Sequence, residues 1–277
     1  MGEAFKVLGL NHGQSGDILI SLPAIRYLCQ NPDIEFTLII NKKFSKIAPF
    51  IRGLDYVKDI YISDGYDNFP SQIDINYLDY KQFDKIYNPM QAHSRPDWYN
   101  HYHYTEEFAI QHNVIGLNET KSFNRKIDLV KLKSVDIDKK IIGLGPYANG
   151  TDRSISKDDA QFIVNCLNKL NYKVMYFGIN CNLENVIELK DNSLLNAGIT
   201  LSNLAGFITV DTLWSWLASG YNVKTFGLYH VNYADMISQW SHFPANVYAK
   251  YIVNRDIKRL DKEMIELELT NWAKNIK

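Results

Sequence analysis

This 277-residue chain has few cysteines, almost no net charge and no long apolar run. Its cysteines form no C-x-x-C pair, which argues against a disulfide framework or a zinc site and predicts a reducing, cytoplasmic location; they are Cys29, Cys166 and Cys181. Thirty basic and 31 acidic residues leave a net charge of -1, which excludes a globally cationic surface for nucleic-acid phosphates. No run approaches the ~18 apolar residues of a membrane span, and residues 1–10 do not resemble a signal peptide. We therefore expect a soluble protein with at most peripheral membrane contact.

What the chain does contain is a repeated alternation of short apolar runs and amphipathic stretches. Hydrophobic residues make up 46% of it, enough for two cores of ordinary size. In the first half, the periodicity predicts strands at 5–10, 35–40, 57–62 and 83–87 and helices at 17–30 and 43–51. In the second half, it predicts strands at 141–145, 173–178, 206–211 and 224–229 and helices at 156–170, 212–219 and 261–275. Strands that alternate with helices indicate doubly wound parallel sheets.

A polar stretch around residues 131–140 separates the two halves. We therefore predict an α/β protein of two Rossmann-like domains, 1–135 and 136–277, whose final helix (261–276) can pack back on the N-terminal domain. Ligands of open parallel sheets bind outside the carboxyl ends of the strands, so two sheets that face each other would form one interdomain cleft. At this point a cleft that binds without catalysing is an equal alternative, because a fold does not determine a function.

The loop after the first predicted strand carries the candidate catalytic group, Asp17. Glycines at 13 and 16 permit the tight backbone turns that place Asp17 at the start of a helix. Aspartate is also a preferred helix cap, and spacing alone favours capping over a role as general base. His12 lies in the same loop, and we assign it to acceptor binding, with a donor contact or a backbone hydrogen bond as alternatives.

Two further segments of the second half lie at the carboxyl ends of predicted strands. Residues 145–153 bring together an amide, a hydroxyl and a guanidinium suited to a diphosphate, those of Asn149, Thr151 and Arg153. An ordinary polar loop, with Arg153 solvated or paired to its neighbour at 152, is the alternative. In residues 208–218 a strand ends at Asp211 and a helix begins at Thr212, whose N-terminus offers a second anion site. Here the alternative is a capped helix whose tryptophans pack in the core.

Residues 88–104 form an unusual stretch of aromatic rings, histidines and one arginine. Aromatic faces bind sugars and a histidine or arginine can hold a phosphate, so we assign His93, Arg95 and Trp98 to acceptor binding. A partly exposed packing segment is an equal alternative. We predict no metal site, because His101 and His103 would not face each other on a helix.

Taken together, the three loop segments resemble motifs of the glycosyltransferase family 9 heptosyltransferases, lipopolysaccharide enzymes of GT-B fold, and most closely the heptosyltransferase I type. Gly16-Asp17 followed by Leu22-Pro23-Ala24 is similar to the family's N-terminal signature, whose aspartate is the proposed general base. Arg153 aligns with a lysine that contacts the donor phosphate. Residues 210–212 resemble the donor-binding Asp-Thr-Gly turn, and a histidine of the following helix falls at Trp216.

The resemblance implies an inverting, metal-independent glycosyltransferase that needs no cofactor. Its donor would be a nucleotide-diphosphate sugar held by Arg153, Asp211, Thr212 and Trp216, and its acceptor a hydroxyl group of a glycan, a glycolipid or another molecule. Three positions depart from the family pattern, namely Ile155, Leu213 and Trp216. They motivate the alternative of a repurposed GT-B-fold protein that binds a nucleotide or nucleotide-sugar without transferring it.

Overall fold

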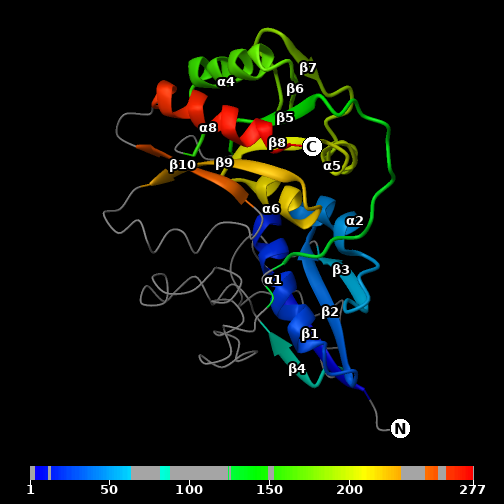
Figure 1. Ribbon diagram of the computed structural model, residues 1–277. Helices are drawn as coiled ribbons and strands as arrows, with labels where there is room; N and C mark the ends of the chain where they lie inside the picture. The colour runs from blue at the N-terminus through cyan, green and yellow to red at the C-terminus, as the bar shows by residue number, and fades with distance from the viewer. Residues whose placement is uncertain are drawn as a thin grey trace. The chain divides into compact units, whose positions relative to one another are not determined.

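The structure is a computed structural model that describes residues 4–11, 14–63, 82–87, 124, 126–148, 153–231, 247–254 and 260–276. The chain forms two compact units, the first extending to Lys131 and the second beginning at Leu132 (Figure 1). Each unit contains one parallel sheet with helices packed on it. The prediction of an α/β protein built on two parallel sheets is confirmed.

The first unit is built on a four-stranded parallel sheet of order β3-β2-β1-β4. The strands are β1 (Phe5–Asn11), β2 (Ile34–Asn41), β3 (Asp59–Ser63) and β4 (Lys85–Tyr87). Helix α1 (Ser15–Leu28) connects β1 to β2, and its residues 18–25 are all buried. A helix that is buried on every side lies within a core. This packing holds α1 in place, and with it the first turn, where Asp17 lies.

The prediction of one continuous helix at residues 43–51 is wrong. The chain forms a 3-10 helix, η1 (Lys42–Ile47), followed by one short α-helical turn, α2 (Ala48–Ile51). Pro49 lies in the first turn of α2. Proline has no N–H to donate to the preceding turn, so the segment restarts there instead of continuing as one α-helix.

The second unit is built on a six-stranded parallel sheet of order β10-β9-β8-β5-β6-β7. Its strands are β5 (Ile141–Gly145), β6 (Lys173–Tyr176), β7 (Val186–Glu188), β8 (Gly206–Val210), β9 (Lys224–Val231) and β10 (Val247–Asn254). Its helices are α4 (Lys157–Lys169), α5 (Leu194–Leu201), α6 (Leu213–Gly220) and α8 (Lys262–Lys274). Figure 1 shows α4 and α8 on one face of the sheet and α6 on the other. The sequence patterns missed β7, α5 and β10.

The core of the second unit lies between the sheet and the pair α4 and α8. Trp272 of α8 is 1% exposed and packs edge-on against Phe226 of β9, with ring centroids 5.7 Å apart. Tyr172 donates a hydrogen bond from its hydroxyl to the carbonyl of Ala273 at 3.1 Å. These contacts of the final helix lie within its own unit, and packing against the first unit stays a prediction. Among the described residues, no helix has the length and apolar character needed to cross a bilayer.

The segment that leads from the first unit to the second is held at both ends. At one end the guanidinium of Arg26, at the close of α1, donates to the carbonyls of Lys126 (2.9 Å) and Asn124 (2.6 Å) and contacts the carboxylate of Asp128. At the other end the side-chain oxygen of Asn203 accepts from Ser134 Oγ and the Val135 N–H, both at 3.3 Å. The polar stretch 131–140 seen in the sequence is thus a connection anchored by side chains.

Replacing Arg26 by alanine should lower the free energy of unfolding by about 2 kcal/mol, because hydrogen bonds to charged groups contribute roughly 1.5–3 kcal/mol when poorly solvated. The Arg26 side chain is 18% exposed, so water replaces the lost donors only in part. Urea unfolding measures the loss, and amide hydrogen exchange should rise at residues 126–130. Lys58→Ala, which breaks the exposed pair with Glu35, is the control and should cost under about 0.5 kcal/mol. Equal losses in the two variants would contradict the anchoring role.

Candidate active site

Three of the predicted donor-binding residues come together on the carboxyl edge of the second unit's sheet. Asp211 directly follows β8, Thr212 caps the next helix, and Arg153 follows the loop after β5, the neighbour of β8 in the sheet. Arg153 Nη1 donates to Asp211 Oδ2 at 3.3 Å, and the two side chains are 38% and 44% exposed. A partly solvated ion pair of this kind is weak, so both charges remain accessible to a polar ligand.

The backbone around Arg153 is fixed by a small set of hydrogen bonds. The Ser154 hydroxyl accepts from the Ala148 N–H at 2.9 Å, and the Ile155 N–H donates to the carbonyl of Pro146 at 3.2 Å. The Ile155 side chain is 4% exposed and belongs to the core. Because the residues on the C-terminal side of Arg153 are anchored, its backbone has a defined place at the sheet edge.

The N-terminus of α6 is capped by Thr212. Its Oγ1 accepts from the Trp214 N–H at 3.1 Å and lies 3.4 Å from Thr209 Oγ1, which in turn donates to the carbonyl of Gly145 at 3.2 Å. This is the capped helix foreseen as the alternative to an anion site. The two are compatible, since a helix N-terminus keeps its positive partial charge when one of its N–H groups is capped. A donor contact by Thr212 stays a prediction.

Tyr229 is a member of this site that the sequence patterns missed. Val210 pairs with Leu228 in the sheet, which places Tyr229 of β9 level with Asp211. Burial, and then the negative charge of Asp211, raise the pKa of the Tyr229 hydroxyl, so it stays protonated at any physiological pH. The indication of Tyr229 in the sequence was that it ends the strand predicted at 224–229.

A second missed feature is a group of aromatic side chains where β5 and β6 end. Tyr147 and Tyr176 pack edge-to-face with ring centroids 6.4 Å apart, and Phe177 packs in the same manner on Trp214 at 5.5 Å. Burial, followed by neighbouring groups such as Tyr147, raises the pKa of Tyr176 to about 12. Its buried hydroxyl has no hydrogen-bond partner among the residues that the structure describes. An unsatisfied buried hydroxyl costs free energy, so this edge favours a ligand or water that supplies a partner.

The two tryptophans of α6 differ in exposure. Trp216, which we predict to contact the donor, is 5% exposed and therefore lies mainly in the core, whereas Trp214 is only partly buried. Core packing was the alternative interpretation of both residues. A donor contact by Trp216 stays a prediction.

In the first unit, Asp17 lies at the third position of α1 and is partly buried. Its Oδ2 accepts a hydrogen bond from the Gln14 N–H at 2.8 Å, so the carboxylate does stabilise the start of the helix. A carboxylate has about four lone-pair positions, so it can take part in a helix cap and also accept a proton. The role of general base stays a prediction.

Several predicted residues lie outside the part of the chain that the structure describes. These are His12, His93, Arg95 and Trp98 of the acceptor set and Asn149 and Thr151 of the donor set. Within the described part, no three His, Cys, Asp or Glu side chains are grouped as a metal site would require.

The fold resembles that of solved sugar-transfer enzymes. The E. coli heptosyltransferase WaaC, solved with ADP, matches with a TM-score of 0.68 at 12% identity, covering 97% of this chain and 100% of that one. A glycosyl transferase family 9 protein from Veillonella parvula matches with a TM-score of 0.68 at 13% identity, covering 100% and 91%. E. coli ADP-heptose lps heptosyltransferase II matches at 0.65 and 12%, covering 97% and 98%. No protein-family model and no curated protein matches the sequence. Likeness at such identities establishes the fold, and the predicted heptosyltransferase-like GT-B fold is confirmed.

Proposed function

We propose that this protein is an inverting glycosyltransferase that moves a sugar from a nucleotide-diphosphate sugar to an acceptor hydroxyl in the cytoplasm, without a metal. The observation that carries the proposal is the grouping of Arg153, Asp211 and the α6 N-terminus at the carboxyl edge of the second unit's sheet. In open parallel sheets this edge is where ligands bind. The structural likeness to WaaC solved with ADP supports a nucleotide donor.

At the donor end, the proposed chemistry is electrostatic. Arg153 and the N-terminus of α6 would stabilise the negative charge that grows on the departing diphosphate. Asp211 holds Arg153 in place and would accept hydrogen bonds from the sugar hydroxyls. Tyr229 follows Leu228, the sheet partner of Val210, and its buried hydroxyl stays protonated beneath this edge.

At the acceptor end, Asp17 would remove the proton from the attacking hydroxyl. General-base assistance of this kind typically contributes ~10²–10⁴-fold in rate. The acceptor hydroxyl attacks the anomeric carbon as the bond to the diphosphate breaks, and its proton passes to the Asp17 carboxylate. His12, His93, Arg95 and Trp98 remain the proposed acceptor-binding residues.

The alternative function is nucleotide or nucleotide-sugar binding without transfer. The burial of Trp216 and Ile155 favours it, because these positions carry polar or aromatic site residues in the family that the sequence resembles, whereas here both side chains are 5% exposed or less. This alternative would be favoured if the protein binds a nucleotide-sugar tightly but releases no nucleoside diphosphate in the presence of any acceptor.

Replacing Arg153 by alanine should weaken the binding of a nucleoside diphosphate by about 10- to 100-fold, because one charge-assisted hydrogen bond contributes about 1.5–3 kcal/mol. Titration calorimetry with ADP and UDP measures the change. Lys157→Ala is the matched control, because Lys157 is an exposed cation only four positions away, and it should bind as the wild type does. Equal affinities in Arg153→Ala and the wild type would exclude Arg153 from the donor site.

A further inference from the structure

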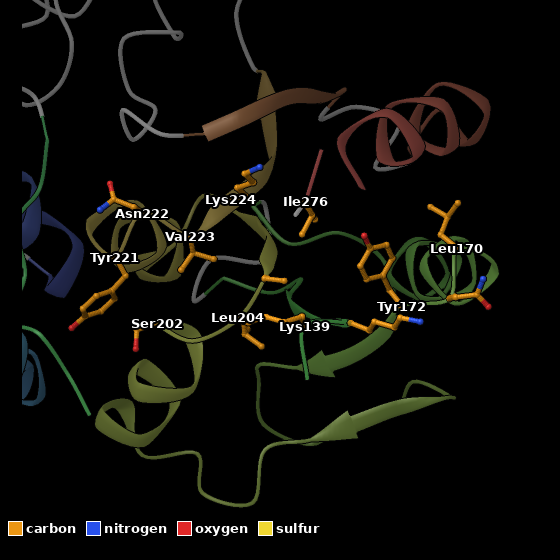
Figure 2. A pocket seen from close by; sticks show the side chains of 13 residues that line it. Lys139, Leu170, Tyr172, Ser202, Leu204, Tyr221, Asn222, Val223, Lys224 and Ile276 are labelled. Carbon is orange, nitrogen blue, oxygen red and sulfur yellow. The ribbon is translucent and has the colours of Figure 1, made fainter. Parts of the chain in front are cut away.

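A groove of about 730 Å³ lies on the amino edge of the six-stranded sheet, opposite the edge that carries Arg153 (Figure 2). Four of the segments that line it immediately precede or begin a strand, namely residues 139–140 before β5, 171–172 before β6, 204–205 before β8 and 222–224 at the start of β9, and Ile276 follows the last helix, α8. A five-residue strand spans roughly 16 Å at the usual rise per residue. The groove is therefore separate from the candidate active site.

The charged side chains of this groove are all cationic. They are Lys139, Lys140 and Lys224, and none of the described lining residues is an aspartate or a glutamate. All three lysines are exposed. Lys224 in addition donates a hydrogen bond from its Nζ to the carbonyl of Asn275. The adjacent acid, Asp138, is engaged by Lys173 Nζ at 3.3 Å and by the Lys140 N–H at 2.9 Å. An anion that enters the groove thus meets lysine charge that Asp138, which also pairs with Lys173, offsets only in part.

Four helices, α4, α5, α6 and α8, end at the groove, and their last carbonyls carry partial negative charge. Hydrogen bonds to these carbonyls reduce that charge, and α4 and α6 close with a Schellman motif. The Tyr172 N–H donates to the carbonyl of Leu167 at 3.0 Å, and the Val223 N–H to that of Ala218 at 2.9 Å. The asparagine between each helix and its strand, at 171 and at 222, takes the positive φ that the motif requires.

Apolar side chains form the floor of the groove. Leu204, Val223 and Ile276 lie along it and are at most 9% exposed, and Figure 2 shows the Tyr172 ring beside them. The ring is fixed because its hydroxyl donates to the carbonyl of Ala273. A rigid apolar floor with lysines at the rim suits a ligand that carries both an anionic group and an apolar body.

We propose that this groove is a second binding site, for a small organic phosphate whose phosphate pairs with Lys139 and Lys140 and whose apolar body lies on Leu204, Val223 and Ile276. Lysine binds phosphate as a flexible point charge. Burial of the apolar body adds the hydrophobic contribution that inorganic phosphate lacks. The proposal is independent of the sugar-transfer function.

Calorimetric titration of the full chain with phenyl phosphate tests the site. The double variant Lys139→Glu/Lys140→Glu should bind phenyl phosphate about 10-fold more weakly or worse, because each reversal replaces attraction by repulsion. Inorganic phosphate should bind the wild type several-fold more weakly than phenyl phosphate does. Both lysines are exposed, so the variant should keep the wild-type melting curve.

Two matched variants locate the binding. Lys157→Glu changes an exposed lysine of the same unit that does not line the groove, and Arg153→Ala removes the cation of the candidate active site. Lys157→Glu should bind phenyl phosphate as the wild type does, and Arg153→Ala should keep the binding event that the double variant lacks. Loss of binding in Arg153→Ala, unchanged binding in the double variant, or no binding by the wild type at millimolar concentration would each overturn the second site. None of these results depends on whether the protein transfers sugar.

Discussion

Replacing Asp17 by asparagine should lower the rate of sugar transfer by about 10²- to 10⁴-fold, the range that general-base catalysis contributes. Asparagine has nearly the same shape as aspartate and keeps an oxygen that can accept from the Gln14 N–H. This hydrogen bond of the helix cap is therefore preserved, whereas the proton acceptor is lost. Donor affinity should stay close to the wild-type value, because the proposed donor site lies in the other unit. Release of nucleoside diphosphate from a panel of nucleotide-sugars measures the rate, and calorimetry measures the affinity.

Asp159 provides a matched control for Asp17. It too occupies the third position of a helix and belongs to its cap, where its backbone N–H donates to the Ser156 hydroxyl at 3.1 Å. Asp159→Asn should leave the transfer rate unchanged. Near wild-type turnover in Asp17→Asn would instead reduce Asp17 to a structural residue.

Alanine at position 17 separates the two roles of this side chain. It should lose transfer as asparagine does and in addition lower the free energy of unfolding by about 0.5–2 kcal/mol, the usual effect of removing a capping group. If the alanine variant loses stability and the asparagine variant loses neither stability nor rate, capping is the whole function of Asp17.

The largest loss of stability is expected for Trp272→Ala, at about 3–5 kcal/mol, because truncating a buried aromatic residue leaves a cavity that the surroundings fill only partly. Trp272 is 1% exposed, packs on Phe226 and also lies against the backbone of β8. A Cβ added at Gly206 would come within 2.9 Å of the Trp272 Cη2 atom. Urea unfolding followed by far-ultraviolet circular dichroism measures the change.

Two variants of the same helix show whether the loss comes from the cavity. Trp272→Phe should cost much less than alanine, because most of the ring volume remains and the buried indole Nε1 has no hydrogen-bond partner among the described residues. Leu267→Ala should change stability by under about 0.5 kcal/mol, since Leu267 is 60% exposed. A Trp272→Ala variant no less stable than Leu267→Ala would show that α8 does not anchor the second unit.

Periodicity in the sequence was sufficient for the elements that form long, buried runs. The strand at 141–145 is found at its predicted bounds, and the helix predicted at 156–170 is found as Lys157–Lys169 with Ser156 as its cap. Among the missed elements, strand β7 has only three residues, too few to establish a period. Helix α5 and strand β10 have eight residues each, the length of the correctly predicted α6, so their length does not explain why they were missed.

For the candidate site, the sequence determined which loops and helix starts carry the chemistry, because polar groups that directly follow a buried strand must emerge at the carboxyl edge of a parallel sheet. It did not determine which of these groups meet. Arg153 pairs with Asp211, 58 positions away, because β5 and β8 are adjacent in the sheet. Tyr229 and the lysine-lined groove likewise emerged only once strand order was known. Local spacing in a chain encodes the elements, whereas the neighbours of each strand depend on how the elements pack, and that packing is decided by the tertiary structure.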